Sequence, residues 1–500
     1  MIVTVPFKNI PAGDQIRVPL FYAEVDNSQA NSATQSQRAL IIGQITAAGT
    51  GVANIPTICQ GVSDAKKVGG PGSMLALETA AYRNSDSFGE LWYLPLADDA
   101  SAVAATGSIN FLTAATATGV LFLYLGGQLV TQTVTSSLTA AQLATALAAT
   151  VNAATDLPVT AAVDGTTTSK VNFTAKNKGL AGNDIDVSVN FRGTANGEVT
   201  PAGLTFTIVA MSGGLVNPSL TTALANLADM PFDFIAMPYT DSTSLDALKS
   251  FLNDQNGRWA WSKGIYGHFF AFYRGTVGAL TTFGVTRNDQ HGTVMGFNGS
   301  PTPAWVAAAD LCGAAAVALR ADPGLPLQTV ALSTFLAPPV ASRFALTDRN
   351  TLLFDGISTF TVADDGTVSI ENLITTYQKN GFGQPDNSYL QVETMFLLMY
   401  VIRRLKGVVT SKYARKKLAA NGTRFAPGAN IVTPNMIRAD QIAEYQAMEF
   451  EGYVQNSAAF AEGLIVEQDP QNPNRVNELW DGTLIDGLRI FALLAQFRLQ

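Results

Sequence analysis

The chain has few of the side chains on which metal sites and disulfide frameworks depend. Its 500 residues include two cysteines, Cys59 and Cys312, and two histidines, His268 and His291. Two cysteines cannot build a disulfide framework, and this usage suits a reducing compartment. Neither histidine has a partner at the spacing of an HxxxH or HxE motif, and there is no CxxC pair. The sequence therefore predicts no metal site.

Groups arranged for catalysis are also missing. Cys312 lies in the small-residue segment WVAAADLCGAAAVAL, where nothing would lower the pKa of its thiol, so a nucleophilic pair with His291 is not expected. The turn GGPGSM at residues 69–74 precedes a helix but lacks the spacing of a dinucleotide or phosphate loop. Asp98 and Asp99 are adjacent, so on a strand they would point to opposite sides. We predict no catalytic residue and no cofactor.

The chain is also poor in charge and in very long apolar runs. Only 14% of its residues are charged and 47% are hydrophobic, a composition that allows large buried cores. We see no apolar run near the roughly 18–20 residues that span a bilayer. The opening residues MIVTVPFKNIPAG lack a basic region followed by a long apolar stretch, so we expect no signal peptide and no membrane insertion.

The order of the expected elements indicates an α/β fold with an open core sheet that an inserted domain interrupts. Residues 1–30, broken by prolines, are predicted to form an extended N-terminal arm. Residues 31–100 begin the core domain with a strand, a helix and a second strand, at 38–46, 74–83 and 90–97. Residues 211–354 continue it, because helices and strands alternate again from Leu220 onward.

Residues 101–210 differ from their surroundings and are predicted to form a small, β-rich α+β domain. Alanine and threonine make up 41 of these 110 residues. The segment LFLYLGGQLVTQTV reads as a hairpin with Gly126 and Gly127 in a tight turn. Thr139 and Gln142 match a capping box for the helix that follows.

Residues 355–487 are predicted to form an α+β C-terminal domain. It would begin with the hairpin GISTFTVADDGTVSI, followed by a long helix from about Ser388 to Lys406 and a helix from Pro434 to Glu451.

Residues 488–500, LRIFALLAQFRLQ, form an unusual end to a chain, because termini are normally polar and frayed. Helical spacing fits some of the apolar positions, but Gly482 and Gly487 favour a strand. Such a strand would be apolar on both faces, as strands buried inside a sheet are. Its apolar residues are Leu488, Ile490, Phe491, Leu493, Leu494, Phe497 and Leu499.

Charge is distributed unevenly near the C-terminus. Residues 394–439 carry nine basic and no acidic side chains, and residues 440–486 carry ten acids against Arg475. Nucleic-acid binding would explain the first block, but the chain has a net charge of −8 and a pI near 4.9, and no stacking platform lies nearby. The block is either a solvated face or a contact between copies. The candidate contact residues are Arg403, Arg404, Lys406, Lys412, Arg415, Lys416 and Lys417.

Several segments resemble one known family. TPNMIRADQIAEYQAMEFEGYVQN at residues 433–456 and NPNRVNELWDGTLIDGLRIFALLAQFRL at residues 472–499 resemble the C-terminal signature of contractile tail sheath proteins of Mu-like phages. The inserted segment and the opening arm, with IPAGDQIRVPLFYAEVDNSQA, are also similar to that group. The resemblance covers nearly the whole chain.

The resemblance implies a structural protein of the virion tail, assembled in the host cytoplasm. Its expected partners are copies of itself in helically stacked hexameric rings, the tail tube protein, and baseplate and tail terminator proteins, with no nucleic acid. Contraction would drive the tube through the host envelope for genome delivery. The C-terminal domain would face the tube and the inserted domain would point outward. The C-terminal arm would add a strand to a sheet of a neighbouring subunit.

Two other functions remain open from the sequence. One is a sheath subunit of a non-viral contractile injection particle, such as a tailocin or a secretion-like system. The other is an α/β enzyme with a binding insertion, against which the scarcity of histidine argues.

Overall fold

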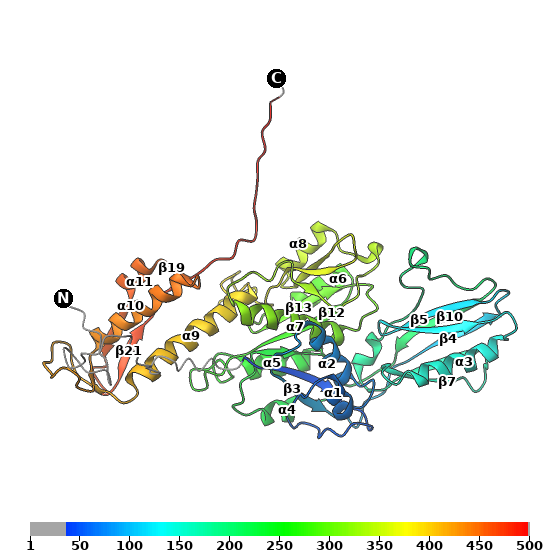
Figure 1. The fold of residues 1–500 in the computed structure, drawn as a ribbon, viewed down its shortest axis with the longest axis horizontal. Helices are drawn as coiled ribbons and strands as arrows, with labels where there is room; N and C mark the ends of the chain where they lie inside the picture. The colour runs from blue at the N-terminus through cyan, green and yellow to red at the C-terminus, as the bar shows by residue number, and fades with distance from the viewer. Residues whose placement is uncertain (1–36, 499–500) are drawn as a thin grey trace, which may run out of the picture.

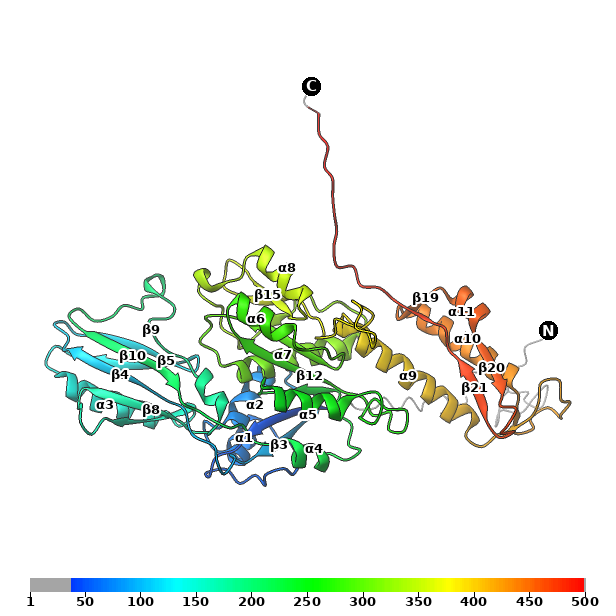
Figure 2. The ribbon, with the colours of Figure 1, turned by 180° about the vertical axis from the view of Figure 1, so that it is seen from behind.

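The computed structural model describes residues 37–498 of the chain, so the predicted N-terminal arm and Leu499 lie outside the described residues. The molecule is elongated, with three parts in a row (Figure 1). A central body lies in the middle, an inserted module at one end and a C-terminal body at the other. The view from behind shows the same arrangement (Figure 2).

The central body is built on a six-stranded sheet. Its strands lie in the order β13, β12, β11, β1, β3 and β2, and all pair in parallel except β2. Every residue of β1 and β13 is buried, as expected for strands covered on both faces. The bounds are β1 Ala39–Gln44, β2 Thr57–Ile58, β3 Leu91–Leu96, β11 Phe234–Ala236, β12 His268–Arg274 and β13 Gly292–Phe297.

Two helices, α2 (Met74–Ser85) and α7 (Ala304–Ala321), pack against each other and against this sheet. Small residues permit the close approach: a Cβ at Gly313 would lie 2.7 Å from the carbonyl oxygen of Tyr82. The other helices of the body are α1 Val62–Gly69, α4 Thr221–Asn226, α5 Ser242–Leu252, α6 Val277–Gly284 and α8 Leu346–Phe354.

Among the described residues one helix, α7, has the length and mean hydropathy of a bilayer-spanning segment, although Asp310 and Arg320 interrupt its apolar residues. Inside the protein, 72% of this helix is buried. Its apolar composition therefore follows from its contacts with α2 and with the central sheet.

The inserted module contains two antiparallel sheets and the helix α3 (Ala140–Ala153). One sheet has the order β10, β4, β8 and β7, and the other has the order β6, β5 and β9. The bounds are β4 Thr106–Thr113, β5 Gly119–Leu125, β6 Gln128–Val134, β7 Val159–Val163, β8 Lys170–Ala175, β9 Val187–Val189 and β10 Thr205–Ser212.

Two local predictions in this module are confirmed. Gly126 and Gly127 join β5 to β6 with φ angles of 58° and 78°, values that favour glycine. At the start of α3 the Thr139 side chain accepts the N–H of Gln142, and the Gln142 side chain accepts the N–H of Thr139 at 2.9 Å. The capping box therefore forms as its sequence indicated.

The hairpin predicted to open the C-terminal domain instead belongs to the central body. Its strands, β15 (Thr359–Val362) and β16 (Val368–Asn372), join β14 (Ala331–Leu332) in a three-stranded sheet. Ile357 and Phe360 pack into the large core cluster, and Ser358 bridges to Met295 on β13. The domain boundary predicted at residue 355 is therefore placed too early, because burial of these side chains ties the hairpin to the first core.

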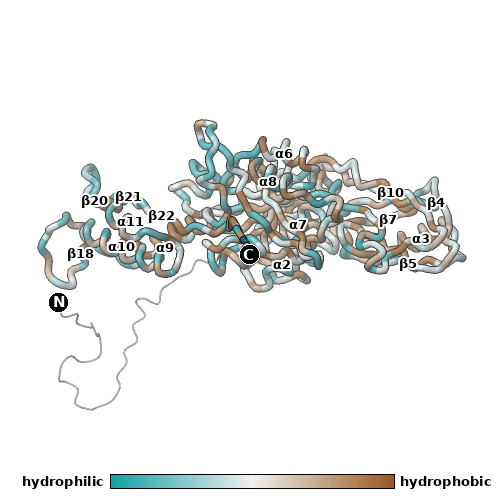
Figure 3. The backbone as a smooth tube through the Cα atoms, turned by 90° about the horizontal axis from the view of Figure 1, so that it is seen from above, coloured by the Kyte–Doolittle hydropathy of each residue, from teal (hydrophilic) through white to brown (hydrophobic). Residues whose placement is uncertain are grey.

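The C-terminal body has a second, smaller core in which Tyr445 stacks on Phe460 with ring centroids 3.8 Å apart. Figure 3 shows hydrophilic colouring along the backbone around its strands β20 and β21. Its helices are α9 Val392–Tyr413, α10 Pro434–Phe450 and α11 Ser457–Gly463. Its strands are β17 Lys417–Leu418, β18 Ile431–Val432, β19 Val454–Gln455, β20 Ile465–Gln468, β21 Val476–Leu479 and β22 Thr483–Leu484.

The helix α9 connects the two cores. Near its start Phe396 stacks on Phe234 of β11 with ring centroids 4.9 Å apart, and further along Val401 is buried in the second cluster. One continuous helix of 22 residues therefore contributes side chains to both bodies.

Candidate assembly surfaces

The C-terminal arm extends away from the rest of the chain (Figures 1 and 2). From Ile490 to Arg498 no strand within the described part of the chain pairs with it. Its apolar side chains are exposed to solvent, at 84% for Ile490, 79% for Phe491, 77% for Leu493, 82% for Leu494 and 83% for Phe497. Leu499, which was predicted to belong to the same arm, lies outside the described residues.

The first two residues of the predicted arm are held by the chain's own central body. The Leu488 carbonyl accepts a hydrogen bond from the Gln328 side chain at 3.3 Å, and the Arg489 guanidinium lies 2.7 Å from a carboxylate oxygen of Glu393. The free part of the arm therefore starts at Ile490 rather than at Leu488.

The strands β20 and β21 form an isolated two-stranded antiparallel sheet at the surface of the C-terminal body. On one face Val466 is buried on the side of α10. On the other face Ile465 and Leu479 are paired in register and are 51% and 59% exposed. Within residues 37–498 neither outer edge of this sheet pairs with a further strand. Such an edge offers backbone groups to an added strand.

The structure divides the basic block that the sequence suggested as a contact surface. Arg403 places both terminal nitrogens on the carboxylate of Asp233, at 2.6 Å each. Arg404 pairs with Glu444 and donates to Glu451 at 2.9 Å. Arg403 and Arg404 therefore already have carboxylate partners within the same chain.

Lys412 is also engaged within the chain, although weakly, since its Nζ lies 3.3 Å from the Asp440 carboxylate on an exposed surface. The remaining candidates, Lys406, Arg415, Lys416 and Lys417, are exposed. Among the described residues none of these four forms an ion pair, and Lys416 lies 5.8 Å from the ring centre of Tyr413. The accessible basic surface therefore runs from Lys406 in the second half of α9 to Lys417 at the start of β17.

The two histidines and Cys312, which were considered for chemistry, are buried. His268 bonds to the Thr293 hydroxyl at 2.8 Å, and burial lowers its pKa well below the usual value. His291 stacks on Trp259 and lies 2.9 Å from Asp254. Burial raises the pKa of the Cys312 thiol, so the thiolate needed for nucleophilic chemistry is disfavoured. Within residues 37–498 there is no group of three or more His, Cys, Asp or Glu side chains that could hold a metal ion.

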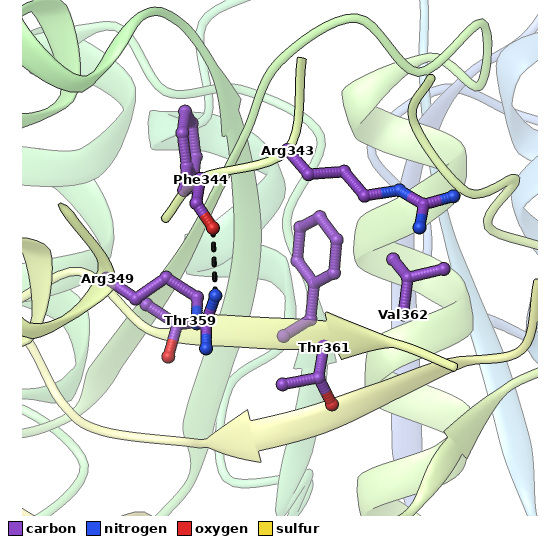
Figure 4. A pocket seen from close by; sticks show the side chains of 8 residues that line it. Arg343, Phe344, Arg349, Thr359, Thr361 and Val362 are labelled. Carbon is purple, nitrogen blue, oxygen red and sulfur yellow. Dashed lines mark hydrogen bonds between the residues drawn. The ribbon is translucent and has the colours of Figure 1, made fainter. Parts of the chain in front are cut away.

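A pocket between β15 and the segment before α8 contains two arginines, but their charged groups do not converge (Figure 4). Arg349 donates to the Phe344 carbonyl at 2.8 Å and to the Glu371 carboxylate at 2.7 Å. Arg343 donates to the Pro338 carbonyl, and its guanidinium lies over Val362, on the other side of the pocket. The arrangement is that of packing side chains rather than of a binding site.

Three acidic residues that connect parts of the molecule were not identified from the sequence. Asp233 and Glu393 pair with Arg403 and Arg489, and Asp184 of the inserted module pairs with Arg274 of the central body. Asp233 and Glu393 each interrupt an apolar segment, FDFIA and VETMFLL, and a lone acid in such a context indicates a buried partner. This pattern indicates that Asp233 has a buried partner but does not identify it, because the partner, Arg403, lies 170 positions away.

Comparison with known proteins identifies relatives along nearly the whole chain. The family model described as the phage tail sheath protein central domain matches residues 213–376, and that of the phage tail sheath C-terminal domain matches residues 384–498. The division between the two matches, like the packing, falls later than residue 355. The Mu-like prophage FluMu tail sheath protein of Haemophilus influenzae is 37% identical over 497 residues, which is 99% of this chain and 100% of the relative.

Solved structures give weaker similarities. Sheath tail proteins of Desulfitobacterium hafniense and Listeria innocua are 13% and 14% identical to this chain, with TM-scores of 0.49 and 0.46. These matches cover 94% and 92% of this chain and 97% and 94% of the solved chains.

Proposed function

The chain belongs to the phage tail sheath family, and we propose that it polymerises into stacked hexameric rings around a tail tube. Contraction of this sheath would drive the tube through the host envelope for genome delivery. As a tail sheath protein it is a structural component of the virion tail, and the proposal concerns how copies of it connect. The observation that carries the proposal is the C-terminal arm from Ile490 onward.

In the isolated subunit the apolar side chains of the arm are in contact with water, which is energetically unfavourable. Fully burying a Leu, Ile or Phe side chain is worth about 1.5–3 kcal/mol, and five such side chains in the described arm are at least 77% exposed. Contiguous exposed apolar surface of this kind marks an interaction site. Both faces of the arm are apolar. If the arm adds as a strand to a sheet of another subunit, and a further layer of that subunit covers the sheet, both faces become buried.

The sheet β20–β21 is the receiving surface that best fits this arm. Its outer edges are unpaired within residues 37–498, and the neighbouring side chains of Ile465 and Leu479 are exposed. We propose that the arm of one subunit adds to this sheet of the next. Backbone hydrogen bonds would connect the rings, and the two exposed side chains would gain an apolar partner.

The elongated shape supports an orientation for the subunit. The inserted module and the C-terminal body lie at opposite ends (Figure 1), so one can face a central tube while the other faces outward. We propose that the C-terminal body faces the tube, because its loop carries the exposed residues Arg415, Lys416 and Lys417. Baseplate and terminator proteins would contact the first and last rings.

The arm can be tested by a change that leaves the body intact. Replacing Phe491 and Phe497 by Asp would place charges in buried positions of the assembled arm, which costs several kcal/mol per site. We expect a folded subunit that forms no connected tubes by negative-stain microscopy. The matched control replaces both residues by Leu, which keeps the apolar surface and should retain tubes. Tubes formed by the double Asp variant would contradict arm exchange.

A further inference from the structure

The buried carboxylate of Glu393 lies where the C-terminal arm departs from the protein. Glu393 is in the first turn of α9 and is 3% exposed. One carboxylate oxygen accepts the N–H of Leu327 at 2.6 Å, and the other lies 2.7 Å from the Arg489 guanidinium, whose side chain is 19% exposed. A buried carboxylate is stabilised only when paired, so Arg489 is held where it meets Glu393.

The residues before Arg489 cross from one body to the other. Leu484 of β22 pairs with Val454 of β19, and the N–H of Ile485 donates to the Tyr453 carbonyl at 3.1 Å, both in the C-terminal body. Gly487 then passes the central body so closely that a Cβ there would lie 2.8 Å from a side-chain atom of Pro326. We call residues 486–489 the crossing segment.

Attachment ends abruptly after the crossing segment. Arg489 is paired with a buried group, whereas the next residue, Ile490, is 84% exposed. The chain therefore changes from held to free across one peptide bond. That position is attached to the start of α9, which packs in the central core, and not to the strands β19 and β22 of the C-terminal body.

We propose that the Arg489–Glu393 ion pair is the pivot from which the exchanged arm leaves, and that it sets the reach and direction of the arm toward the neighbouring subunit. The inference rests on the arm exchange proposed above. Arg489 is thus a positioning residue, because it acts through the residues that follow it.

The pivot limits the length of the free tether. Residues 490–498 span about 30 Å when extended, at about 3.3 Å per residue. Releasing Arg489 would free residues 486–489, because Ile485 stays bonded to Tyr453, and would add about 13 Å by the same rule. Effective concentration falls roughly as the −3/2 power of tether length once a tether exceeds the span it must bridge, so this release alone would lower it about twofold. The arm would also lose its fixed direction, which would lower its effective concentration at the neighbouring subunit further.

The ion pair can be tested in the isolated subunit with trypsin. The variant Glu393→Gln keeps an oxygen to accept the Leu327 N–H but removes the charge that holds Arg489. Cleavage after Arg489 needs local release, and its rate follows the population of the released state. We expect it to rise on the order of tenfold in the variant. Cleavage in the exposed segment Arg415–Lys417 is the internal control and should not change. Equal cleavage after Arg489 in both proteins would overturn the pivot.

A second variant covers the case in which Glu393→Gln does not fold. In Arg489→Gln the trypsin site is lost, so hydrogen exchange of the amides in residues 486–488 replaces proteolysis. We expect faster exchange than in the parent and than in Arg489→Lys, which keeps the charge. Identical exchange in all three proteins would also overturn the pivot.

Assembly separates this inference from the function on which it rests. Glu393→Gln and Arg489→Gln should raise the protein concentration needed for tube formation at least about twofold, with Arg489→Lys between them and the parent. Deleting residues 490–500 should abolish connected tubes. If the deletion still gives tubes, arm exchange itself is wrong. If the deletion abolishes tubes but the point variants assemble as the parent does, only the pivot is wrong.

Discussion

Arg403 on α9 and Asp233, the residue before β11, form a two-pronged ion pair with both nitrogen–oxygen distances at 2.6 Å. The Asp233 side chain is 1% exposed and the Arg403 side chain 15%. Because α9 also carries residues of the second core, this pair fixes the C-terminal body to the central sheet.

Replacing Arg403 by Ala should lower the free energy of unfolding by about 3–5 kcal/mol, because Asp233 would remain buried without its partner. The measurement is urea unfolding followed by circular dichroism. Lys406→Ala, an exposed position on the same helix, is the control and should change stability by no more than about 0.5 kcal/mol. Adding Asp233→Asn to Arg403→Ala should recover part of the loss. A loss below about 1 kcal/mol in Arg403→Ala would show that the pair is dispensable.

Reversing Arg415, Lys416 and Lys417 to Glu should leave folding intact and slow co-assembly with the tail tube. The three side chains are exposed and form no ion pair within residues 37–498, so their contribution would be long-range attraction. Such attraction is screened beyond about 8 Å at physiological salt. The parent rate, followed by light scattering, should therefore fall with salt more steeply than that of the variant. Lys178→Glu with Lys263→Glu, on the other two parts, is the control. Unchanged rates in the triple variant would assign the block to a solvated face.

Excising residues 101–210 tests how the inserted module is attached. Asp184 of the module pairs with Arg274 and accepts the N–H of Ala304 at the start of α7. Excision should thus destabilise the central body by about 1–3 kcal/mol, since Arg274 loses a charged partner but keeps the carbonyls of Ser300 and Thr302 and gains water. Arg274→Met in the excised protein should recover part of this loss. We expect the excised protein to fold and form tubes, and the isolated module to fold alone by circular dichroism. If the excised protein folds but forms no tubes, the inserted module is needed for polymerisation and this prediction is wrong.

Glu78 should make the stability of the central body depend on pH. It is fully buried on α2, and burial raises its pKa well above the usual 4.5. The folded state therefore keeps a proton that the unfolded chain releases, so stability falls as pH rises above about 4.5. Glu78→Gln has no side-chain proton to release and so removes this pH dependence. Its free energy of unfolding should equal that of the parent near pH 4 and exceed it by about 1–3 kcal/mol at pH 7–8.

The control for this experiment is Glu462→Gln, an exposed position in the C-terminal body. Its stability difference from the parent should be the same at both pH values. A Glu78→Gln variant with a pH-independent difference would show that Glu78 is ionised in the folded protein.

Local patterns were the most reliable part of the sequence interpretation. The turn at Gly126–Gly127 and the capping box of Thr139 and Gln142 depend on residues at most three positions apart, and both form. The hairpin at residues 359–372 also forms as predicted, yet it joins the central body. Its strands could be predicted because turn chemistry is local, whereas the surface it covers depends on which apolar groups meet in three dimensions.

The charge pattern shows the same limit. Nine basic residues without an acid suggested one contact surface, but Arg403 and Arg404 each meet carboxylates distant in sequence. Only the exposed positions at the end of α9 and beyond remain available. Net charge along a segment does not reveal which charges are already paired, because pairing depends on distances between elements.

The sequence by itself determined the alternation of helices and strands, the compositional break of the inserted module and the apolar character of the C-terminal arm. Each of these follows from side-chain periodicity, turn geometry or composition within a short window. Only the tertiary structure decided that α9 joins two cores, that Asp184 attaches the inserted module, and that the arm becomes free at Ile490 after Arg489 meets Glu393. The physical reason is that a buried charge is stable only beside its partner, and the fold alone determines which distant side chains become partners.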